Sequence, residues 1–484
     1  MIDLDPMGCS VSGDIRKFTP VMRVIRFLSV LVILAIIAAV GFFALTSHAE
    51  IPAEEASAHS QFDAQLIAHG EALASVGNCI ACHTVPGKQA FAGGLAIPTP
   101  FGTLYSTNIT PDPETGIGRW SEAAFNRAMR EGVDREGNNL YPAFPFDHFT
   151  HVTDEDNRAL YAYLMTRAPV HAVAPANQLP FPLTLRPLLA GWKLLFFREG
   201  AFTPDPAQSD AWNRGAYLAE GLGHCGACHT PRNSLGAEDA SRHFAGGEAE
   251  GWHAFAINAA SAAPIPWDKD SIAFYLRHGW HQFHGVAGGP MAEVTGNLGS
   301  LPDSDIDAIA TYVASNMGQP SADKTAKADE LRKAFSGDQG ELIKVSTEQN
   351  PTVAKTASMP GAAIYMATCS TCHESGRPPP FGGMNFGLST AIHAPSPQNA
   401  INIALYGLPP ADGQPSAVMP AFGGSLNDAQ IADLLVYLRA RFTDQGPWQD
   451  VASLVAKTRS GKIKVTVVPS DGIERAPLNV GAKE

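Results

Sequence analysis

Cysteine is scarce in this 484-residue chain outside one repeated motif. Six of the seven cysteines stand in three copies of Cys-x-x-Cys-His, and only Cys9 is left over. One spare thiol cannot build a disulfide framework, a four-thiolate zinc site or an iron–sulfur cluster. These absences leave the three motifs as the main carriers of chemistry.

Positive charge is also in short supply. The chain has 34 Lys and Arg against 47 Asp and Glu, which gives a formal net charge of −13. An acidic surface repels phosphate backbones, so we do not expect nucleic acid as a partner.

The three motifs occupy residues 79–83, 225–229 and 369–373. Two thiols three residues apart on a helical turn can reach the two vinyl groups of one porphyrin, and the adjoining histidine is delivered to the iron. The motifs therefore predict three covalently attached haems c. The predicted attachment residues are Cys79, Cys82, Cys225, Cys228, Cys369 and Cys372, and the predicted iron ligands beside them are His83, His229 and His373.

The residues around the motifs repeat as well. Each motif follows a Gly-containing helical stretch, precedes a Gly-Gly pair, and lies upstream of an apolar-periodic helix with a tyrosine: Tyr163, Tyr312 or Tyr437. The length fits about three domains. We expect an all-α fold with three tandem class I cytochrome c-type domains and little β structure, preceded by one N-terminal transmembrane or signal helix. The expected boundaries are a signal or anchor segment at 1–50, domains at 60–175, 205–318 and 358–445, an apolar linker at 176–204, a polar linker at 319–357 and a tail at 446–484.

Residues 27–45 form an uncharged apolar run behind Arg16, Lys17, Arg23 and Arg26. A run of this length can span a bilayer, and the basic flank would hold the N-terminus in the cytoplasm. Small residues around Ala49 also suit signal-peptidase cleavage. Both alternatives place the haems outside the cytoplasm. We further expect translation to start at Met22, because the preceding residues are unusual for a signal, and Cys9 would then be absent from the protein.

The two linkers differ in composition. Residues 179–197 are apolar but interrupted by Arg186, Pro187 and Lys193, which favours a buried linker over a membrane span. Their aromatic residues beside basic ones also suit a membrane interface or a partner subunit. The polar linker should be exposed and flexible, or should lie over a partner.

The sixth iron ligands decide whether each haem only transfers electrons or also binds small molecules. Met291, in a Gly-Pro-Met sequence, and Met419, in Met-Pro-Ala-Phe, are the candidates for the second and third haems. A thioether raises the potential and closes the site. The alternative for each is an ordinary core methionine.

The first segment departs from this arrangement. Phe144 stands at the position corresponding to these methionines, and it cannot ligate iron. His148, four residues later, is the candidate ligand and would lower the potential. Met129, Met165, His151 or a five-coordinate iron are the alternatives.

A few other polar residues invite a functional interpretation. His278, His281 and His284 could hold a metal, although histidines at the surface or beside a haem are more common. Arg232 and Arg377 follow the second and third motifs and could pair with haem propionates.

The order of the motifs, with the sequences at 101–112, 116–118 and 212–218, resembles the triple-haem cytochrome c subunits of membrane-bound bacterial dehydrogenases. The resemblance covers about residues 60–445. It implies a subunit that takes electrons from a dehydrogenase on the periplasmic side of the inner membrane and passes them to quinone or a terminal oxidase.

Two features of the sequence favour one class of partner among those known in that family. Subunits of quinoprotein alcohol dehydrogenases and FAD gluconate dehydrogenases typically carry methionine where Phe144 stands. Residues 256–261, with Trp267, Trp280 and Met291, look more like the partners of molybdenum hydroxylases that oxidise aldehydes or N-heterocycles. We therefore expect a molybdopterin subunit and an iron–sulfur subunit as partners, with the alcohol or gluconate type as the alternative.

The expected role is a non-catalytic electron-transfer subunit of an oxidoreductase complex. A haem enzyme, such as a peroxidase that uses the first haem, is an alternative of another class, and a diffusible carrier is a third. Rapid binding of cyanide or carbon monoxide would expose the haem enzyme, and purification without any dehydrogenase would expose the carrier.

Overall fold

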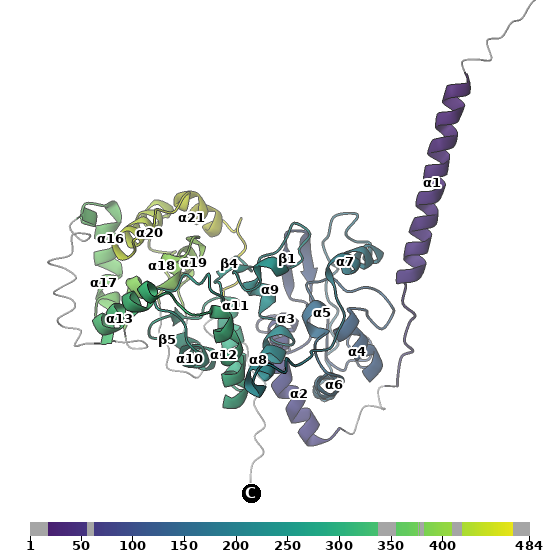
Figure 1. Cartoon of the computed structure of the whole chain (residues 1–484), viewed down its shortest axis with the longest axis horizontal. Coiled ribbons are helices and arrows are strands. Elements are labelled where there is room, and N and C mark those ends of the chain that lie inside the picture. Colours follow the sequence, from purple (N-terminus) through teal and green to yellow (C-terminus); the bar gives the residue numbers. More distant parts are fainter. Residues whose placement is uncertain are drawn as a thin grey trace, which may run out of the picture.

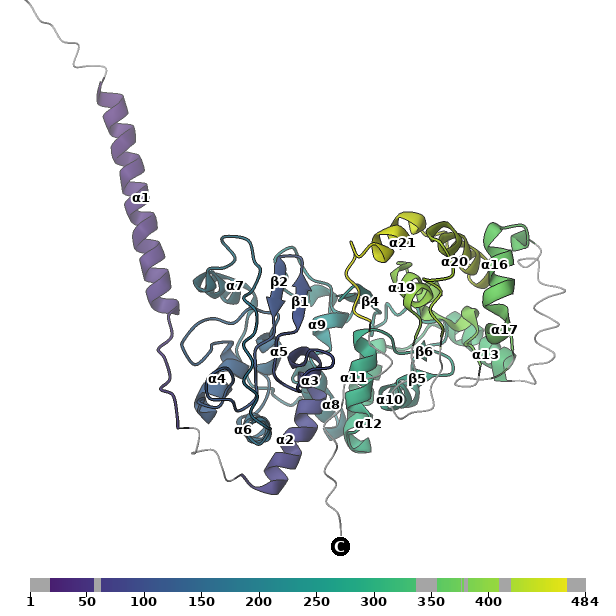
Figure 2. The same cartoon turned by 180° about the vertical axis from the view of Figure 1, so that it is seen from behind.

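The computed structural model describes residues 18–55, 62–336, 355–375, 377, 382–408 and 419–467. The described part is mostly helical, with three short antiparallel hairpins. Helix α1 (Phe18–Thr46) projects away from the rest of the molecule in both views (Figures 1 and 2). Among the described residues, no helix is both long and apolar enough to cross a membrane. Cys9 lies outside the described residues.

Each of the three motif-bearing segments contains a pair of packed helices, one before the motif and one near the segment's end. The pairs are α2 (Ala64–Val76) with α6 (Asp154–Met165), α8 (Asp210–Glu220) with α12 (Asp303–Met317), and α16 (Pro360–Thr368) with α20 (Asp428–Phe442). Side-chain caps begin several of these helices: Thr153 accepts a hydrogen bond from the N–H of Asp156, and Asn427 forms a capping box with Gln430.

A glycine allows each helix pair to approach closely. A Cβ placed on Gly70, Gly215 or Gly361 would lie about 2 Å from a backbone carbonyl oxygen of the paired helix. No side chain fits at such a distance, so the backbones can touch only where glycine stands. The same close contact therefore recurs in all three segments.

The first two segments also share a hairpin after the motif. Strands β1 (Ala96–Thr99) and β2 (Gly102–Tyr105) pair in the first segment, and β3 (Gly247–Ala249) and β4 (Trp252–Ala254) pair in the second. A third hairpin, β5 (Trp280–His281) with β6 (Gly285–Val286), follows α10 (Lys269–His278). The remaining elements are α3 (Cys79–His83), α4 (Glu122–Glu131), α5 (Phe146–Phe149), α9 (Gly226–His229), η4 (Ala240–Arg242), α11 (Pro290–Leu298), α17 (Ser370–His373), η5 (Phe386–Leu388), α18 (Thr390–His393) and α19 (Gln398–Tyr406).

The first and second segments share one hydrophobic core. Leu160 and Tyr161 of α6 belong to the same buried cluster as Leu218 of α8 and Ile306 of α12. The third segment has its own core around Tyr365 of α16. Along the molecule the second segment lies between the first and the third (Figure 1).

The linkers differ from the expectations. The apolar linker contains η3 (Arg186–Leu188) and α7 (Leu189–Phe196), and several of its leucines are exposed instead of buried. The polar linker contains α13 (Ala322–Ser336), whose Ala, Lys, Glu, Leu and Arg residues are good helix formers. Ala328 of α13 is fully buried in a small cluster with Ile265 and Leu388, so this part of the linker packs against both neighbouring segments.

The tail after residue 445 folds back over the molecule. Helix α21 (Val451–Arg459) packs on α20 and α19. Beyond it, the carbonyl of Thr466 accepts a hydrogen bond from Trp252 Nε1 at 2.8 Å, and the Thr466 N–H donates to the Glu250 carbonyl at 3.0 Å. The tail thereby ties the third segment to the hairpin of the second.

Candidate functional site

The three motif histidines are held in the same way. Each donates its Nδ1 hydrogen to a backbone carbonyl: His83 to Thr107 at 2.7 Å, His229 to Phe255 at 2.6 Å and His373 to Met384 at 2.7 Å. Donation from Nδ1 places the free lone pair on Nε2, which is the arrangement of an iron-ligating imidazole. Burial lowers the pKa of all three rings and so favours the neutral form that metal ligation requires.

The carbonyls of Thr107 and Phe255 belong to loops that have similar backbone structure in the first two segments. Phe91 and Phe244 both adopt left-handed backbone, and the N–H of each donates to the threonine that follows the motif histidine, Thr84 or Thr230. Sequence reasoning missed these carbonyl partners, because a backbone carbonyl leaves no residue-type signal.

The motif cysteines lie on the short helical turns α3, α9 and α17 or at their starts. Burial raises the pKa of Cys79 to about 11 and that of Cys225 to about 12, so both stay protonated near neutral pH. Neutral thiols of this spacing are the groups that form thioethers with porphyrin vinyls.

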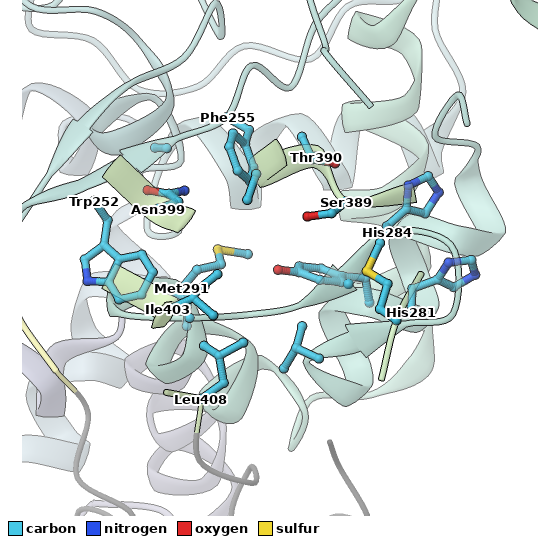
Figure 3. Close-up of a pocket in the computed structure, with 18 of the residues that line it drawn as sticks. Trp252, Phe255, His281, His284, Met291, Ser389, Thr390, Asn399, Ile403 and Leu408 are labelled. Atoms are coloured by element: carbon cyan, nitrogen blue, oxygen red, sulfur yellow. The ribbon is translucent and has the colours of Figure 1, made fainter. Parts of the chain in front are cut away.

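One continuous cavity of about 850 Å³ joins the second and third segments (Figure 3). Its walls include Trp252, Phe255 and Leu408, and Figure 3 shows the Met291 thioether reaching into it. The chemistry-bearing residues that line it are Cys225, Cys228, His229, Met291, Cys369, Cys372, His373 and Met419. Both predicted attachment sites and both predicted methionine ligands therefore face the same apolar chamber.

The two methionines are positioned by backbone structure. Met291 lies in the first turn of α11, behind Pro290, and the N–H and carbonyl of Met419 pair with those of Leu408 at 3.0 and 2.9 Å. A chamber with a histidine and a methionine on its walls for each motif fits covalently held haem c, and the residues present thus fit the expected group at the second and third motifs.

Two histidines of the His278, His281 and His284 group also line this chamber. His284 is 8% exposed, and its ring stacks on Trp267 with 3.5 Å between the ring centroids. The ring of His281 stacks on that of His284, with 4.9 Å between the centroids. Burial lowers the pKa of His284 to about 3, so its ring is neutral. His278 lies apart, against Phe274. The stack is more consistent with histidines beside a haem than with a three-histidine metal site.

The two arginines differ in their surroundings. Arg377 lines the chamber, where it can meet a haem carboxylate, as the sequence suggested. Arg232 donates to the carbonyls of Gly236 and Ala227 instead and lies 3.8 Å from Glu238.

The structure places His148 at the boundary of the first two segments. Its Nδ1 meets the Glu220 carbonyl at 2.9 Å and its Nε2 meets Glu238 at 2.8 Å, both in the second segment. Burial alone would lower the pKa of His148, but the hydrogen bond and charge of Glu238 raise it to about 9. Both nitrogens of His148 are therefore engaged in this structure, and its role as the iron ligand of the first segment stays a prediction.

The structure also places the alternatives for that ligand, which stay open as predictions. Met129 and Met165 are buried in the shared core, and His151 Nδ1 meets the Gly200 carbonyl at 2.9 Å. Phe144 packs edge-on against Phe149.

The chain is similar to known proteins along most of its length. Residues 67–168 match the family described as cytochrome c, and residues 356–438 match the family described as cytochrome c oxidase, cbb3-type, subunit III. A nicotinate dehydrogenase subunit of Pseudomonas putida is 44% identical over 87% of this chain, which spans only 34% of that protein's length.

Two further relatives are covered nearly from end to end. The gluconate 2-dehydrogenase cytochrome c subunit of Pantoea cypripedii is 38% identical over 82% of this chain and 91% of its own length. The cytochrome c subunit of the quinone-type alcohol dehydrogenase of Gluconacetobacter polyoxogenes is 34% identical over 82% of this chain and 85% of its own length.

Proposed function

The chain belongs to the cytochrome c subunits of bacterial dehydrogenases, and we propose that it conducts electrons from a partner dehydrogenase to a respiratory acceptor through three covalently bound haems c. The observation that carries the proposal is the threefold recurrence of a Cys-x-x-Cys-His motif whose histidine is fixed through Nδ1 to a backbone carbonyl. Haem c supplies one-electron redox chemistry when bound.

The protein's own groups define what each site does. With haem c bound, the motif histidines would supply Nε2 as an iron ligand, and Met291 and Met419, which line the same chamber, would supply the second ligand and so keep small molecules out. The apolar walls exclude water, which reduces the reorganisation that accompanies a change of charge. Because the second and third motifs line one chamber, haems bound there would be close neighbours and would exchange electrons without a partner protein between them.

The partner that we propose is a molybdenum hydroxylase, made of a molybdopterin subunit and an iron–sulfur subunit, that oxidises an aldehyde or an N-heterocycle. Support comes from the nicotinate dehydrogenase relative and from Phe144 at the position where alcohol and gluconate subunits typically have methionine. Quinone or a cytochrome oxidase is the proposed acceptor. A quinoprotein alcohol or FAD gluconate dehydrogenase is the alternative partner.

The proposed location is the periplasmic side of the inner membrane. The support is the uncharged run at 27–45 behind a basic flank, and exposed apolar side chains along α1, among them Ile33 and Ile37. The segment either remains as an anchor or is removed after export.

A direct test is to purify the chain from membranes with its companions, identify them by mass spectrometry and count haems per chain. Three haems with a molybdopterin subunit and an iron–sulfur subunit would support the full proposal. A quinoprotein or flavoprotein companion would keep the electron-transfer role and replace the molybdenum partner. The absence of any dehydrogenase, or fewer than three haems, would contradict it.

A second candidate function draws on one observation. Phe144 cannot ligate iron and His148 is engaged by Glu220 and Glu238, so the first haem could present an open face for small-molecule chemistry. Rapid cyanide or carbon monoxide binding by one haem in three would favour this haem enzyme, and unchanged spectra would exclude it.

A further inference from the structure

The segment between the first two motif-bearing segments carries a cluster of exposed, large apolar side chains. Leu194 and Leu195 of α7 are 69% and 62% exposed, and Phe181 before it is 80% exposed. Other exposed members of this cluster are Leu183, Leu185, Leu188 and Leu235. Leu235 comes from the second segment and joins α7 through its carbonyl, which accepts a hydrogen bond from Trp192 Nε1 at 3.0 Å. Many exposed large apolar side chains within one short segment indicate a contact site.

The inner side of α7 is firmly attached to the protein. Lys193 Nζ donates to the carbonyls of Glu131 and Gly132, at the C-terminal end of α4, at 2.6 and 2.8 Å. Phe197 packs edge-on against Phe146, and Ala190 is buried. The exposed leucines are thus presented by a helix that is held in place.

The outer side of α7 faces α1. Gly191, Leu194 and Leu195 recur at the spacing of one helical face. A Cβ on Gly191 would lie 3.9 Å from Phe42 Cζ near the end of α1, and nothing else lies within 4 Å of it.

The chain that follows α1 is fixed to the same part of the protein. Arg127 donates to the Ala49 carbonyl at 2.7 Å, and Arg135 pairs with Glu50 at 2.9 Å. The C-terminal end of α1 and the outer face of α7 therefore lie together.

We infer that the outer face of α7, with the exposed leucines before it, lies in the boundary between headgroups and acyl chains of the membrane as an interfacial contact of this subunit. The inference rests on the proposed membrane location and adds a second contact beside α1. An interfacial helix needs an apolar outer face, an aromatic residue at its edge and no excess of negative charge. Residues 179–197 meet these conditions, because they include Trp192 and no acidic residue in a chain of net charge −13.

Lipid explains the exposure better than water does. Moving a leucine side chain out of water is favourable, and Leu194 and Leu195 are largely exposed shortly before the exposed Arg198, a side chain suited to headgroup phosphates. The continuity with α1 selects a bilayer over a protein partner as the occupant.

Photocrosslinking in native membranes tests the inference with the full haem-loaded chain. The photoreactive residue benzoylphenylalanine would replace Leu195, and adducts would be identified by mass spectrometry. Ile37, which is 61% exposed on α1, reports on the membrane location itself. Met366, which is 57% exposed on α16 in the third segment, is the matched control away from α1.

Lipid adducts at Leu195 and Ile37 but not at Met366 are expected. Lipid at Ile37 with none at Leu195 would overturn the α7 contact and leave the location intact, whereas no lipid at either would overturn both. A protein adduct at Leu195 would show that a partner covers α7 and would overturn the inference. Haem absorbance checks folding of each variant, and Leu185 is a second probe position if the Leu195 variant misfolds.

Discussion

Met291 and Met419 are the proposed thioether ligands on which the redox behaviour of two haems would depend. Each lies in the chamber wall together with a motif histidine that is fixed by a backbone carbonyl. A thioether ligand favours the reduced iron and so raises the potential.

Met419→Leu should lower the potential of one haem and leave the other two unchanged, because leucine fills the space without a sulfur ligand. A redox titration followed by visible spectroscopy measures this, and the variant should also gain carbon monoxide binding at one haem. Met366→Leu, an exposed methionine on α16, is the control and should alter neither property. An unchanged potential in Met419→Leu would show that Met419 is a packing residue.

His148 links the first two segments through a charge. Its folded pKa of about 9 lies above the ordinary value of 6.5, so the protonated ring stabilises the fold. This stabilisation is fully present below about pH 6.5 and is lost as the pH rises through about 9.

His148→Gln should remove this pH dependence, since glutamine keeps a hydrogen-bond donor but cannot titrate. Melting temperatures measured across that pH range would show a decline in the parent chain and a flatter profile in the variant. His148→Ala should cost about 3 kcal/mol of unfolding free energy, because Glu238 would lose its buried partner. Equal slopes in parent and glutamine variant would contradict the charged pair.

Among the elements, the close packing of each of the three helix pairs depends on one glycine. The carbonyl oxygens of Ala159, Ala308 and Asp433 lie about 2 Å from the positions that a Cβ would take. Alanine ordinarily stabilises a helix by up to about 1 kcal/mol over glycine, but the steric clash reverses the sign here.

Gly215→Ala should destabilise the protein by about 1–3 kcal/mol, because α8 and α12 must separate to admit the methyl group. Chemical denaturation gives the free energy of unfolding. Gly424→Ala is the matched control, since nothing lies within 4 Å of its added Cβ, and it should change stability by less than about 0.5 kcal/mol. A neutral Gly215→Ala would show that the helix pair tolerates a wider spacing.

Across the molecule as a whole, hydrogen bonds between distant segments set how the second and third sites face each other. Asn399 of α19 both accepts from the N–H of His253 and donates to its carbonyl, each at 2.8 Å. Asn402 donates to the Gly251 carbonyl at 2.9 Å. Together with the tail at Thr466, these bonds close the chamber that the two segments share.

Asn399→Ala should cost about 1–3 kcal/mol, because both backbone groups of His253 would lose a buried partner. Limited proteolysis should then separate the third segment more readily, while the haem spectra stay unchanged. Gln445→Ala, at an exposed amide, serves as the control. If proteolysis were unaffected, the contacts of the tail and of α13 would be sufficient to hold the third segment on the second.

Local patterns in the amino-acid sequence were enough to identify the chemistry of this protein. Covalent attachment depends on residue spacing along one helical turn, so Cys79, Cys82 and His83 and their two repeats could be predicted as haem sites without coordinates. The mostly helical fold and the tyrosine-bearing helices α6, α12 and α20 followed from periodicity for the same reason, since both are local properties of the chain.

Contacts between distant residues required the folded structure. Packing directed His148 toward Glu238, buried Ala328 of the polar linker, and left the leucines of α7 exposed. It also joined Met291 and Met419 in one chamber. Such outcomes follow from long-range packing and from backbone carbonyls with no sequence signal, which no local pattern encodes.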